Sequence, residues 1–384
     1  MTLRVLHAVA SVGDSYGGVA AAVAALGGVE ARLRHDATLV TVHRPEEGGR
    51  ILRDLPLWFD VELVPPGRFA GRFHGSARLK STLARLVPQH DLVVVHGVFD
   101  FTAHLCGRTA RQYAVPYLVW PHGSLDPYDL HKHAWAKRRL APLWRETLAG
   151  AAAVVCTTAR EAERLVDFGA GSRRTVLPLP VPTAAPDPRA VARRACGLPA
   201  DGRIVLFLGR IDEKKGLPLL LAAFDRAARP GDVLVVAGAG DDRLDRELRT
   251  TAAARPGAGR VVFTGWADPV RRRDLLAAAD VFALLSDNEN FGVAVAEALV
   301  AGVAVLVSDE VYLGDELAPE GAAVVTPRDP AAAGRALRDL LGDDRRRRAV
   351  GAAGRAWACR ELDDGRVGDR YRQLVKEVLT RWSA

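Results

Sequence analysis

The chain has 384 residues, 49% of them hydrophobic, which is typical of a globular protein with two domains and a large core. No apolar run approaches the ~20 residues of a membrane span, and the N-terminus MTLRVLHAVASVG lacks the features of a signal peptide. We therefore expect a cytoplasmic protein. Its net charge of +7 permits anionic partners, but nucleic-acid binding would rest on that charge alone and is not predicted. Four scattered cysteines indicate neither a disulfide framework nor a metal site.

Short apolar strands alternate with helices through the first 180 residues. The first strand runs into a glycine-rich stretch, in which Gly17 and Gly18 stand at the start of a helix. These glycines either let the backbone approach a ligand or only form a tight turn, because the full dinucleotide-binding spacing is missing. Residues 45–73 have no clear pattern. Strands are predicted at residues 3–10, 36–44, 91–98, 117–123 and 151–158, and helices at residues 76–87, 101–114 and 159–170.

Two histidines follow neighbouring strands of this first sheet. His96 ends the run VVVH, and His122 lies between Pro121 and Gly123, just past the run YLVW. Because parallel strands present their carboxyl ends at one edge of a sheet, both histidines are expected at the edge where ligands bind. A lone histidine is more often structural, and two together leave a structural role and a ligand-binding role equally open.

A basic and aromatic segment covers residues 124–151. Its aromatic residues include Trp135 and Trp144, and its cations include Lys132, Lys137, Arg138 and Arg139. The segment either forms an ordinary helix with a solvated basic face, which we favour, or touches a membrane surface or an anionic acceptor.

A proline-rich stretch, LPLPVPTAAPDP at residues 177–188, interrupts the alternation and indicates an interdomain linker. The alternation then resumes, which predicts two doubly wound, Rossmann-like α/β domains facing each other across a cleft. The predicted divisions are an N-terminal domain at 1–180, a linker at 181–200, a C-terminal domain at 201–360, and a C-terminal helix at 361–384 that packs back on the first domain. In the second domain, strands are predicted at residues 202–210, 232–240, 260–266, 281–286 and 303–308, and helices at residues 217–228, 242–255, 270–279, 292–301 and 365–382, the last after an irregular turn region.

The segment LGRIDEKKG is the most informative part of the second half. A buried strand ends at Gly209 and is followed by Arg210 and, five residues later, by Lys215. Two cations from one strand-end loop can neutralise a diphosphate leaving group without a metal. Because Asp212 and Glu213 could pair with them, a solvated basic loop is the alternative, and we favour the functional interpretation. Further residues at the same edge are Gly238 and Gly240, in a second glycine turn, and Trp266, which either contacts a base or packs.

Two glutamates flank the next strand–helix connection. Glu289 follows the strand VFALLS, and Glu297 lies on the helix that begins near Phe291 and Gly292. The start of this helix offers free N–H groups to a phosphate. Carboxylates would repel a phosphate unless they bind the hydroxyls of an attached sugar, and as isolated residues they are equally well explained as solvated surface groups.

Taken together, these residues resemble the retaining GT-B glycosyltransferases of the "group 1" family over nearly the whole chain. The family's two glutamates with seven intervening residues match Glu289-NFGVAVA-Glu297, and its G-R-x-x-x-x-K-G clamp matches Gly209, Arg210, Lys215 and Gly216. The glycine pair at 17–18 resembles the family's N-terminal loop. The P-H-G turn with LDPY, which contains Asp126, resembles a subset that acts on cell-surface polysaccharides or glycolipids. Val303 replaces a proline common in the family.

The resemblance implies a role for each matched residue. Glu297 would hold the ribose hydroxyls, Glu289 the donor-sugar hydroxyls, and His122 a sugar hydroxyl beside the anomeric centre. The backbone N–H groups of Asn290, Phe291 and Gly292 would lie near the sugar and phosphate. Residues assigned to the acceptor are His96, Asp126 and Lys132.

We therefore predict a glycosyltransferase that moves a sugar with retention from a UDP- or GDP-sugar to a glycan, lipid-linked or small-molecule acceptor, with no metal or other cofactor. Peripheral contact with the inner membrane face through residues 132–145 is left open. The alternatives are a nucleotide-sugar epimerase or hydrolase of the same fold and a non-catalytic protein that binds glycans or polyanions. A dehydrogenase is disfavoured because the glycine fingerprint and its acidic partner are missing.

Overall fold

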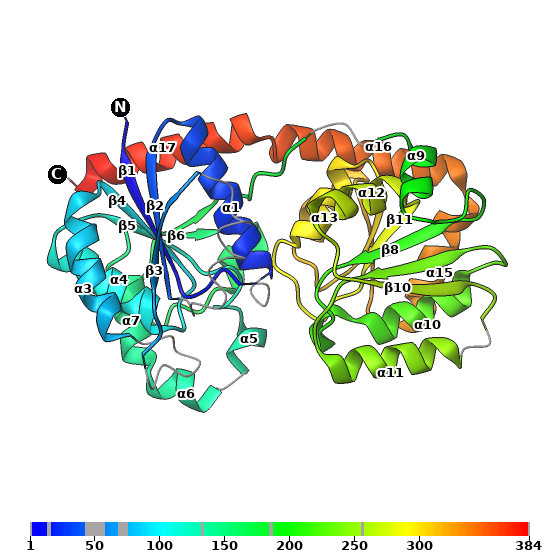
Figure 1. Cartoon of the computed structure of the whole chain (residues 1–384), viewed down its shortest axis with the longest axis horizontal. Coiled ribbons are helices and arrows are strands. Elements are labelled where there is room, and N and C mark those ends of the chain that lie inside the picture. The colour runs from blue at the N-terminus through cyan, green and yellow to red at the C-terminus, as the bar shows by residue number, and fades with distance from the viewer. Residues whose placement is uncertain are drawn as a thin grey trace. The chain divides into compact units, whose positions relative to one another are not determined.

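A computed structural model of the chain describes residues 2–13, 17–42, 58–67, 76–131, 134–183, 187–254 and 257–382. The chain forms two compact units (Figure 1): an N-terminal unit of Met1–Pro180 with Asp364–Ala384, and a C-terminal unit of Val181–Asp363. Across the described residues, no helix is both long and apolar enough to cross a bilayer.

The N-terminal unit is built on a seven-stranded parallel sheet with the order β3-β2-β1-β4-β5-β6-β7. Its central strands are short aliphatic runs that are buried on both faces, as expected when helices cover both sides of a parallel sheet. The strands are β1 Arg4–Val9, β2 Asp36–Val42, β3 Asp60–Val64, β4 Leu92–His96, β5 Tyr117–Trp120, β6 Ala153–Cys156 and β7 Arg174–Val176.

Helices cover both faces of this sheet. On one face, α1 contributes Val23 to a cluster with Val9 of β1 and Leu39 of β2. Helix α17, at the end of the chain, packs against α1, so the C-terminal helix crosses back to the first domain. On the other face, a larger apolar cluster joins α3, α4 and α7 to the strands. The helices of this unit are α1 Gly17–Arg32, α3 Ala77–Leu86, η3 Val87–Gln89, α4 Phe101–Gln112, α5 Pro127–His131, α6 Ala134–Arg139, α7 Ala141–Ala149, α8 Ala159–Arg164 and α17 Asp364–Trp382.

The C-terminal unit contains a six-stranded parallel sheet with the order β10-β9-β8-β11-β12-β13. The strands are β8 Ile204–Leu208, β9 Val233–Ala237, β10 Arg260–Gly265, β11 Val281–Leu284, β12 Ala304–Ser308 and β13 Val324–Thr326. The helices are α9 Arg189–Ala195, η4 Glu213–Lys215, α10 Leu217–Ala227, α11 Asp242–Ala253, α12 Pro269–Ala278, α13 Val293–Val300, α14 Gly314–Leu317, η5 Ala318–Glu320, α15 Pro330–Gly342 and α16 Asp344–Glu361. The strand order changes direction between β8 and β11, and their carboxyl ends carry the predicted donor loops.

The structure differs from the predicted elements in several places. The stretch at 45–73, predicted to lack a pattern, contains the edge strand β3, whose half-exposed residues give little alternation; positions 45–57 and 68–73 lie outside the described residues. The predicted linker contains α9, which packs against α12. The basic segment at 124–151 forms three short helices instead of one. The three-residue strand β7 follows α8, which ends earlier than predicted.

The region predicted as irregular turns before the last helix instead contains α15 and α16. Its glycines favour a turn prediction, because glycine is a poor helix former. In α16, however, a Cβ on Gly351 would lie 2.3 Å from the carbonyl oxygen of Gly302. The glycine is therefore there to let the helix approach the end of α13 closely.

Candidate functional site

The loop after β8 carries the predicted clamp, and its backbone is tightly constrained. Asp212 caps η4 by accepting a hydrogen bond from the Lys214 N–H at 3.0 Å, and the Lys214 carbonyl accepts one from Asp287 N–H at 2.8 Å. Gly216 adopts a left-handed conformation with φ +65°, and a Cβ there would lie 1.9 Å from the Leu285 carbonyl oxygen. The loop is thus bound to the segment that follows β11, where Glu289 lies.

Lys215 and Glu289 form a direct ion pair between these two loops. Their side chains are 20% and 17% exposed, so the pair is largely shielded from solvent. Arg210 instead lies 3.5 Å from Asp212, with half of its side chain exposed. Among the ion pairs of the described residues, Glu213, which the sequence also offered as a partner, joins neither Arg210 nor Lys215. The structure therefore brings together two of the predicted residues, Lys215 and Glu289, which are 74 positions apart in the chain.

The backbone of Glu289 is held from both sides. Its N–H donates to the Glu310 carbonyl at 2.9 Å, and its carbonyl accepts from the Tyr312 N–H at 2.8 Å. The Asn288 side-chain amide donates to the Tyr312 hydroxyl at 2.7 Å. These bonds fix the direction in which the Glu289 side chain leaves the loop.

Helix α13 begins directly beyond Glu289 with an open N-terminus. Its N-cap is Gly292, which has φ +68° and provides no side-chain cap. Within the described part of the chain, the N–H groups of Val293 and Ala294 have no hydrogen-bond acceptor. Neighbouring Asn290 is half-buried, and Phe291, at 4% exposure, anchors the turn in the core. Free N–H groups at a helix start suit a phosphate or another anion.

Glu297 pairs with Arg272, which the sequence analysis did not single out. One terminal nitrogen of Arg272, on α12, donates to both carboxylate oxygens of Glu297 at 2.6 Å. Burial raises the pKa of Glu297 and the guanidinium opposes that rise, while the Glu297 side chain keeps 26% of its surface exposed. Arg272 is one of three consecutive arginines in the run VRRRD. Only the direction in which its side chain leaves α12 distinguishes it from its two neighbours.

The glycine-rich strand ends form a continuous backbone edge. The Gly209 N–H donates to the Ala237 carbonyl at 3.0 Å, and the Gly238 N–H donates to the Gly265 carbonyl at 2.8 Å. Gly240 lies so close to Ile211 that a Cβ would come within 2.1 Å of its carbonyl oxygen. Trp266 follows this edge with 59% of its surface exposed, so it is not a core residue. These positions supply backbone and an indole face at the carboxyl edge of the second sheet.

In the N-terminal unit, His122 and His96 both lie at the carboxyl edge of the sheet, as predicted, and they are also in direct contact. His122 Nε2 lies 3.0 Å from His96 Nδ1, and the two rings are nearly coplanar, with a 4° interplanar angle and 5.3 Å between centroids. Burial lowers the pKa of His122 to about 4, and burial beside other imidazoles lowers that of His96 well below its ordinary value. Both rings are therefore neutral at pH 7.

The turn that carries His122 is held by Glu161, which the sequence analysis also missed. His122 has φ +50°, an unusual value for a residue other than glycine. The Gly123 N–H donates to Glu161 Oε1 at 2.7 Å, and the Thr157 N–H donates to Glu161 Oε2 at 2.6 Å. Glu161 stands in the ordinary helical run AREAER, where nothing in the sequence marks it.

The remaining predicted residues of this unit are less closely associated. Asp126 is buried and accepts hydrogen bonds from Tyr128 N–H at 2.8 Å and Arg164 Nε at 3.1 Å, which are contacts within its own unit. Gly17 and Gly18 begin α1 and are exposed, with open space where a Cβ would stand. Lys132 lies outside the described residues.

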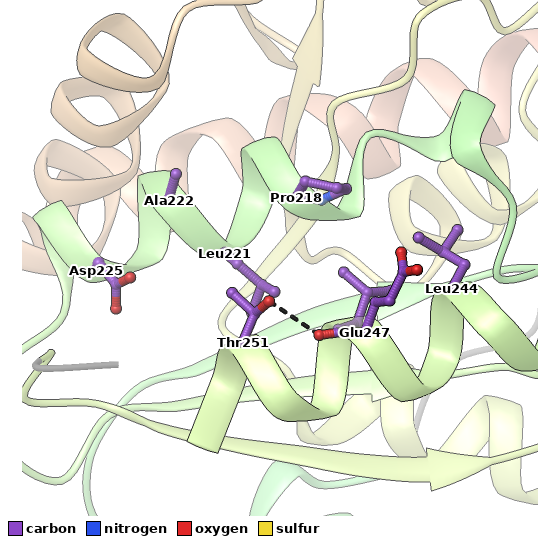
Figure 2. Close-up of a pocket in the computed structure, with 8 residues that line it drawn as sticks. Pro218, Leu221, Ala222, Asp225, Leu244, Glu247 and Thr251 are labelled. Carbon is purple, nitrogen blue, oxygen red and sulfur yellow. Dashed lines mark hydrogen bonds between the residues drawn. The ribbon is translucent and has the colours of Figure 1, made fainter. Parts of the chain in front are cut away.

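A pocket in the C-terminal unit lies apart from these residues. Figure 2 shows it between α10 and α11, where it is lined by Pro218, Leu221, Ala222, Asp225, Leu244, Glu247, Leu248 and Thr251. None of these eight lining residues belongs to the predicted donor site, so the pocket plays no part in the proposal below.

Comparison with known families identifies the chain. Residues 189–357 match the family of glycosyl transferases group 1, and residues 17–180 match the glycosyl transferase 4-like domain. The chain belongs to the group 1 glycosyl transferases. Each match falls within one unit of this group 1 glycosyl transferase, and together they confirm the family predicted from the glutamate spacing and the clamp motif.

Relatives of this group 1 glycosyl transferase are named for different sugars and acceptors. It is 39% identical over 156 residues to a phosphatidyl-myo-inositol mannosyltransferase of Mycolicibacterium smegmatis, an alignment that covers 39% of each chain. It is 30% identical over 284 residues to the 2-deoxystreptamine N-acetyl-D-glucosaminyltransferase of Streptomyces fradiae, covering 68% of this chain and 66% of that protein. The chain spans only 39%, 54% and 63% of the length of the first three curated relatives.

Solved structures share the fold at low identity. The crystal structure of HepE from Anabaena in complex with UDP and glucose matches with a TM-score of 0.80 and 17% identity, covering 98% of this chain and 100% of that one. A sucrose-phosphate synthase from Thermosynechococcus elongatus matches with a TM-score of 0.76 and 21% identity, covering 98% and 100%. The two parallel, Rossmann-like sheets of this group 1 glycosyl transferase thus belong to the GT-B fold, as predicted.

Proposed function

We propose that this protein transfers a sugar from a UDP- or GDP-sugar to a hydroxyl of a glycan, lipid-linked or small-molecule acceptor. The observation that carries the proposal is the ion pair of Lys215 with Glu289 beside the open N-terminus of α13. Family membership and the complex of a neighbour of the same fold with UDP and glucose support the same substrate class.

The combination of charges at this ion pair fits a phosphosugar better than a simple anion. Lys215 and the N–H groups of α13 attract a diphosphate, and Arg210 adds a second cation from the same loop. A carboxylate next to that lysine would weaken the binding of free phosphate. Glu289 is explained when the ligand also carries hydroxyl groups that donate hydrogen bonds to it.

The nucleotide is assigned to the neighbouring part of the C-terminal unit. Glu297 would accept hydrogen bonds from the two ribose hydroxyls, and Arg272 holds its carboxylate in place through both oxygens. Trp266 offers an exposed indole face that could stack on the base. These assignments leave UDP and GDP as equal candidates.

We assign retention at the anomeric carbon and a front-face displacement. The bond from the anomeric carbon to the diphosphate oxygen breaks, the bond to the acceptor oxygen forms on the same face, and the acceptor proton passes to the departing oxygen. His122 is assigned a hydrogen bond to a sugar hydroxyl. Arg210 and Lys215 would neutralise the negative charge of the departing diphosphate, a role that a metal ion would otherwise take. We therefore expect transfer to survive dialysis against EDTA. An inverted product, identified by NMR, would overturn the retention assignment.

Two measurements test the proposal. A thermal-shift screen should show stabilisation by UDP or GDP and by one of their sugar conjugates, because ligands of the native state raise apparent stability. With that donor, Lys215→Ala should lower kcat/KM by about 10²- to 10³-fold, the effect of removing one stabilising donor from a transition state. Lys214→Ala is the matched control, since it removes the same charge one residue away. Equal rates for the two variants would refute the clamp.

We also propose peripheral contact with an anionic membrane through α6. Trp135 on this helix is 75% exposed, and Arg139 lies 5.8 Å from the centre of its ring. An exposed tryptophan beside arginines suits the headgroup region of a membrane. Trp135→Ser should reduce co-sedimentation with phosphatidylglycerol vesicles, whereas Trp58→Ser, which changes an exposed tryptophan on another segment, should not; equal binding of both would contradict the proposal.

A further inference from the structure

A chain of hydrogen bonds leads from the partly buried His122 into the buried interior of the N-terminal unit. Beyond the 3.0 Å contact between His122 and His96, the Nε2 of His96 lies 3.1 Å from Nδ1 of His7. The Nε2 of His7 in turn lies 3.3 Å from Oε1 of Glu30. His96 and His7 each use one ring nitrogen for each neighbour, so each ring can donate at one end and accept at the other.

The register of the sheet produces this arrangement. His7 on β1 is paired with Val94 of β4, and His96 stands two residues beyond Val94. His96 is paired with Trp120 of β5, and His122 stands two residues beyond Trp120. Side chains alternate along a strand, so His7 and His96 lie on one face of the sheet, and His122 contacts His96 from the turn that follows β5. Each step moves one strand over and two residues toward the carboxyl edge.

Glu30 on α1 ends the chain as a fully buried carboxylate. Besides His7, it accepts hydrogen bonds from His35 Nδ1 at 2.7 Å and from the Tyr371 hydroxyl of α17 at 2.5 Å. Burial raises the pKa of Glu30, but hydrogen bonds from His35, His7 and Tyr371 outweigh it and lower the pKa to about 2. Glu30 is therefore ionised at neutral pH and can only accept hydrogen bonds.

An acceptor at one end determines the direction of every bond in the chain. The hydrogen of His7 must lie on Nε2 to reach Glu30, which leaves Nδ1 of a neutral His7 as an acceptor. His96 must then donate from Nε2 and accept at Nδ1, and His122 must donate from Nε2. The remaining nitrogen, Nδ1 of His122, carries no hydrogen. Among the described residues it has no hydrogen-bond partner.

We propose that His96, His7 and Glu30 are positioning residues that hold His122 as the Nε2–H tautomer and keep its Nδ1 as an acceptor for a hydroxyl of the sugar substrate. The identity of that hydroxyl rests on the proposed function, whereas the tautomer is a property of the protein alone. The rings of His122 and His96 lie nearly in one plane, with 4° between them, and the Trp120 ring lies 6.1 Å from His122 between centroids, so the plane of the His122 ring is fixed as well.

The first experiment reads the tautomers directly. Long-range ¹H–¹⁵N correlation spectra of the full chain, labelled with ¹⁵N-histidine and assigned through single His→Gln variants, should show His7, His96 and His122 protonated on Nε2 only. A doubly protonated His7 would reverse every donor and place the hydrogen of His122 on Nδ1. That result, or an even mixture of tautomers at His122, would overturn the inference. The spectra need no substrate, so they test it even if no nucleotide sugar proves to be a donor.

The second experiment breaks the chain while keeping a ring in place. His96→Phe should populate both tautomers of His122 and lower kcat by about 10- to 100-fold. This is the loss that is typical when a residue that hydrogen-bonds to a metal-binding histidine is removed. Its affinity for UDP or GDP, measured by calorimetry, should not change. His104→Phe is the matched control, because His104 is a buried histidine of α4, which packs on the opposite face of the sheet.

The outcomes of the two variants separate structure from positioning. If His96→Phe lowers kcat no more than His104→Phe does, the chain only supports the fold and the inference is wrong. If His96→Phe fails to fold, the spectra of the unmodified protein still decide the tautomer. If no variant and no wild-type preparation transfers sugar, the proposed function fails, while the tautomer result stands or falls by itself.

Discussion

The buried carboxylate of Glu30 should make the stability of the N-terminal unit depend on pH in a calculable way. Its pKa is lowered from 4.5 to about 2 in the folded protein. A carboxyl whose pKa is depressed by folding contributes stability that is present above pH 4.5 and is lost as pH falls toward 2. Glu30→Gln removes the titrating group, so the variant should lack this part of the pH dependence.

The size of the effect follows from the two pKa values. Linkage gives a loss of about 0.8 kcal/mol in the unfolding free energy between pH 7 and pH 4, and about 2 kcal/mol by pH 3. The Glu30 side chain has no exposed surface, so solvent screening does not reduce these values. At pH 7 the variant should already be less stable by about 2 kcal/mol, because a neutral amide cannot accept from all three donors.

The assay must separate this unit from the rest of the chain. Hydrogen-exchange mass spectrometry in increasing urea, followed on peptides from β1 and α1, reports the opening of the N-terminal unit alone. The stability difference between wild type and Glu30→Gln should shrink by about 0.8 kcal/mol from pH 7 to pH 4. Glu62→Gln, on the exposed edge strand β3, is the surface control. A difference that stays constant with pH would refute the description of Glu30 as a carboxylate held ionised by three donors.

Three further predictions concern the candidate site. In a denaturation assay, Gly216→Ala should destabilise the C-terminal unit by about 3 kcal/mol or more, because the new Cβ would overlap the Leu285 carbonyl. The control Gly231→Ala, also at positive φ but in open space, should cost only about 1 kcal/mol. Glu297→Ala should weaken nucleotide binding about tenfold by calorimetry, and equal affinity would reject the ribose assignment. Since the pKa of His122 is lowered to about 4, the acid limb of the kcat profile should lie near pH 4; loss of activity near pH 6.5 would contradict a His122 that is neutral at that pH.

The sequence predicts the sheets well because their strands are short aliphatic runs between glycine or proline turns. Pattern reading fails where burial is one-sided or where glycine has a packing role. β3 is an edge strand with one buried residue, so it has almost no alternation to detect. In α16, Gly354 lies against Leu299 and the Ala322 carbonyl, so a residue that usually ends helices instead permits close packing.

The candidate site is predictable to the extent that its residues share one loop or one short motif. Arg210 and Lys215 are recognised by their spacing, and Glu289 by its distance from Glu297. Arg272 is invisible in the sequence because it is defined by its orientation toward Glu297 from another helix. His7 is hidden for a similar reason, since it reads as one position of an apolar strand until the register of β1 and β4 is known.

The charges proposed for the donor site contact opposite charges within the protein: Lys215 with Glu289, Arg210 with Asp212, and Arg272 with Glu297. Such pairing means that no isolated charge has to be buried, which would be costly. It also couples parts of the ligand. A diphosphate that binds Lys215 competes with Glu289 for the same ammonium group and leaves carboxylate oxygens free to accept sugar hydroxyls. Phosphate and sugar should therefore bind more strongly when joined than separately, which is the selectivity that a transferase needs for its intact donor over the released nucleotide.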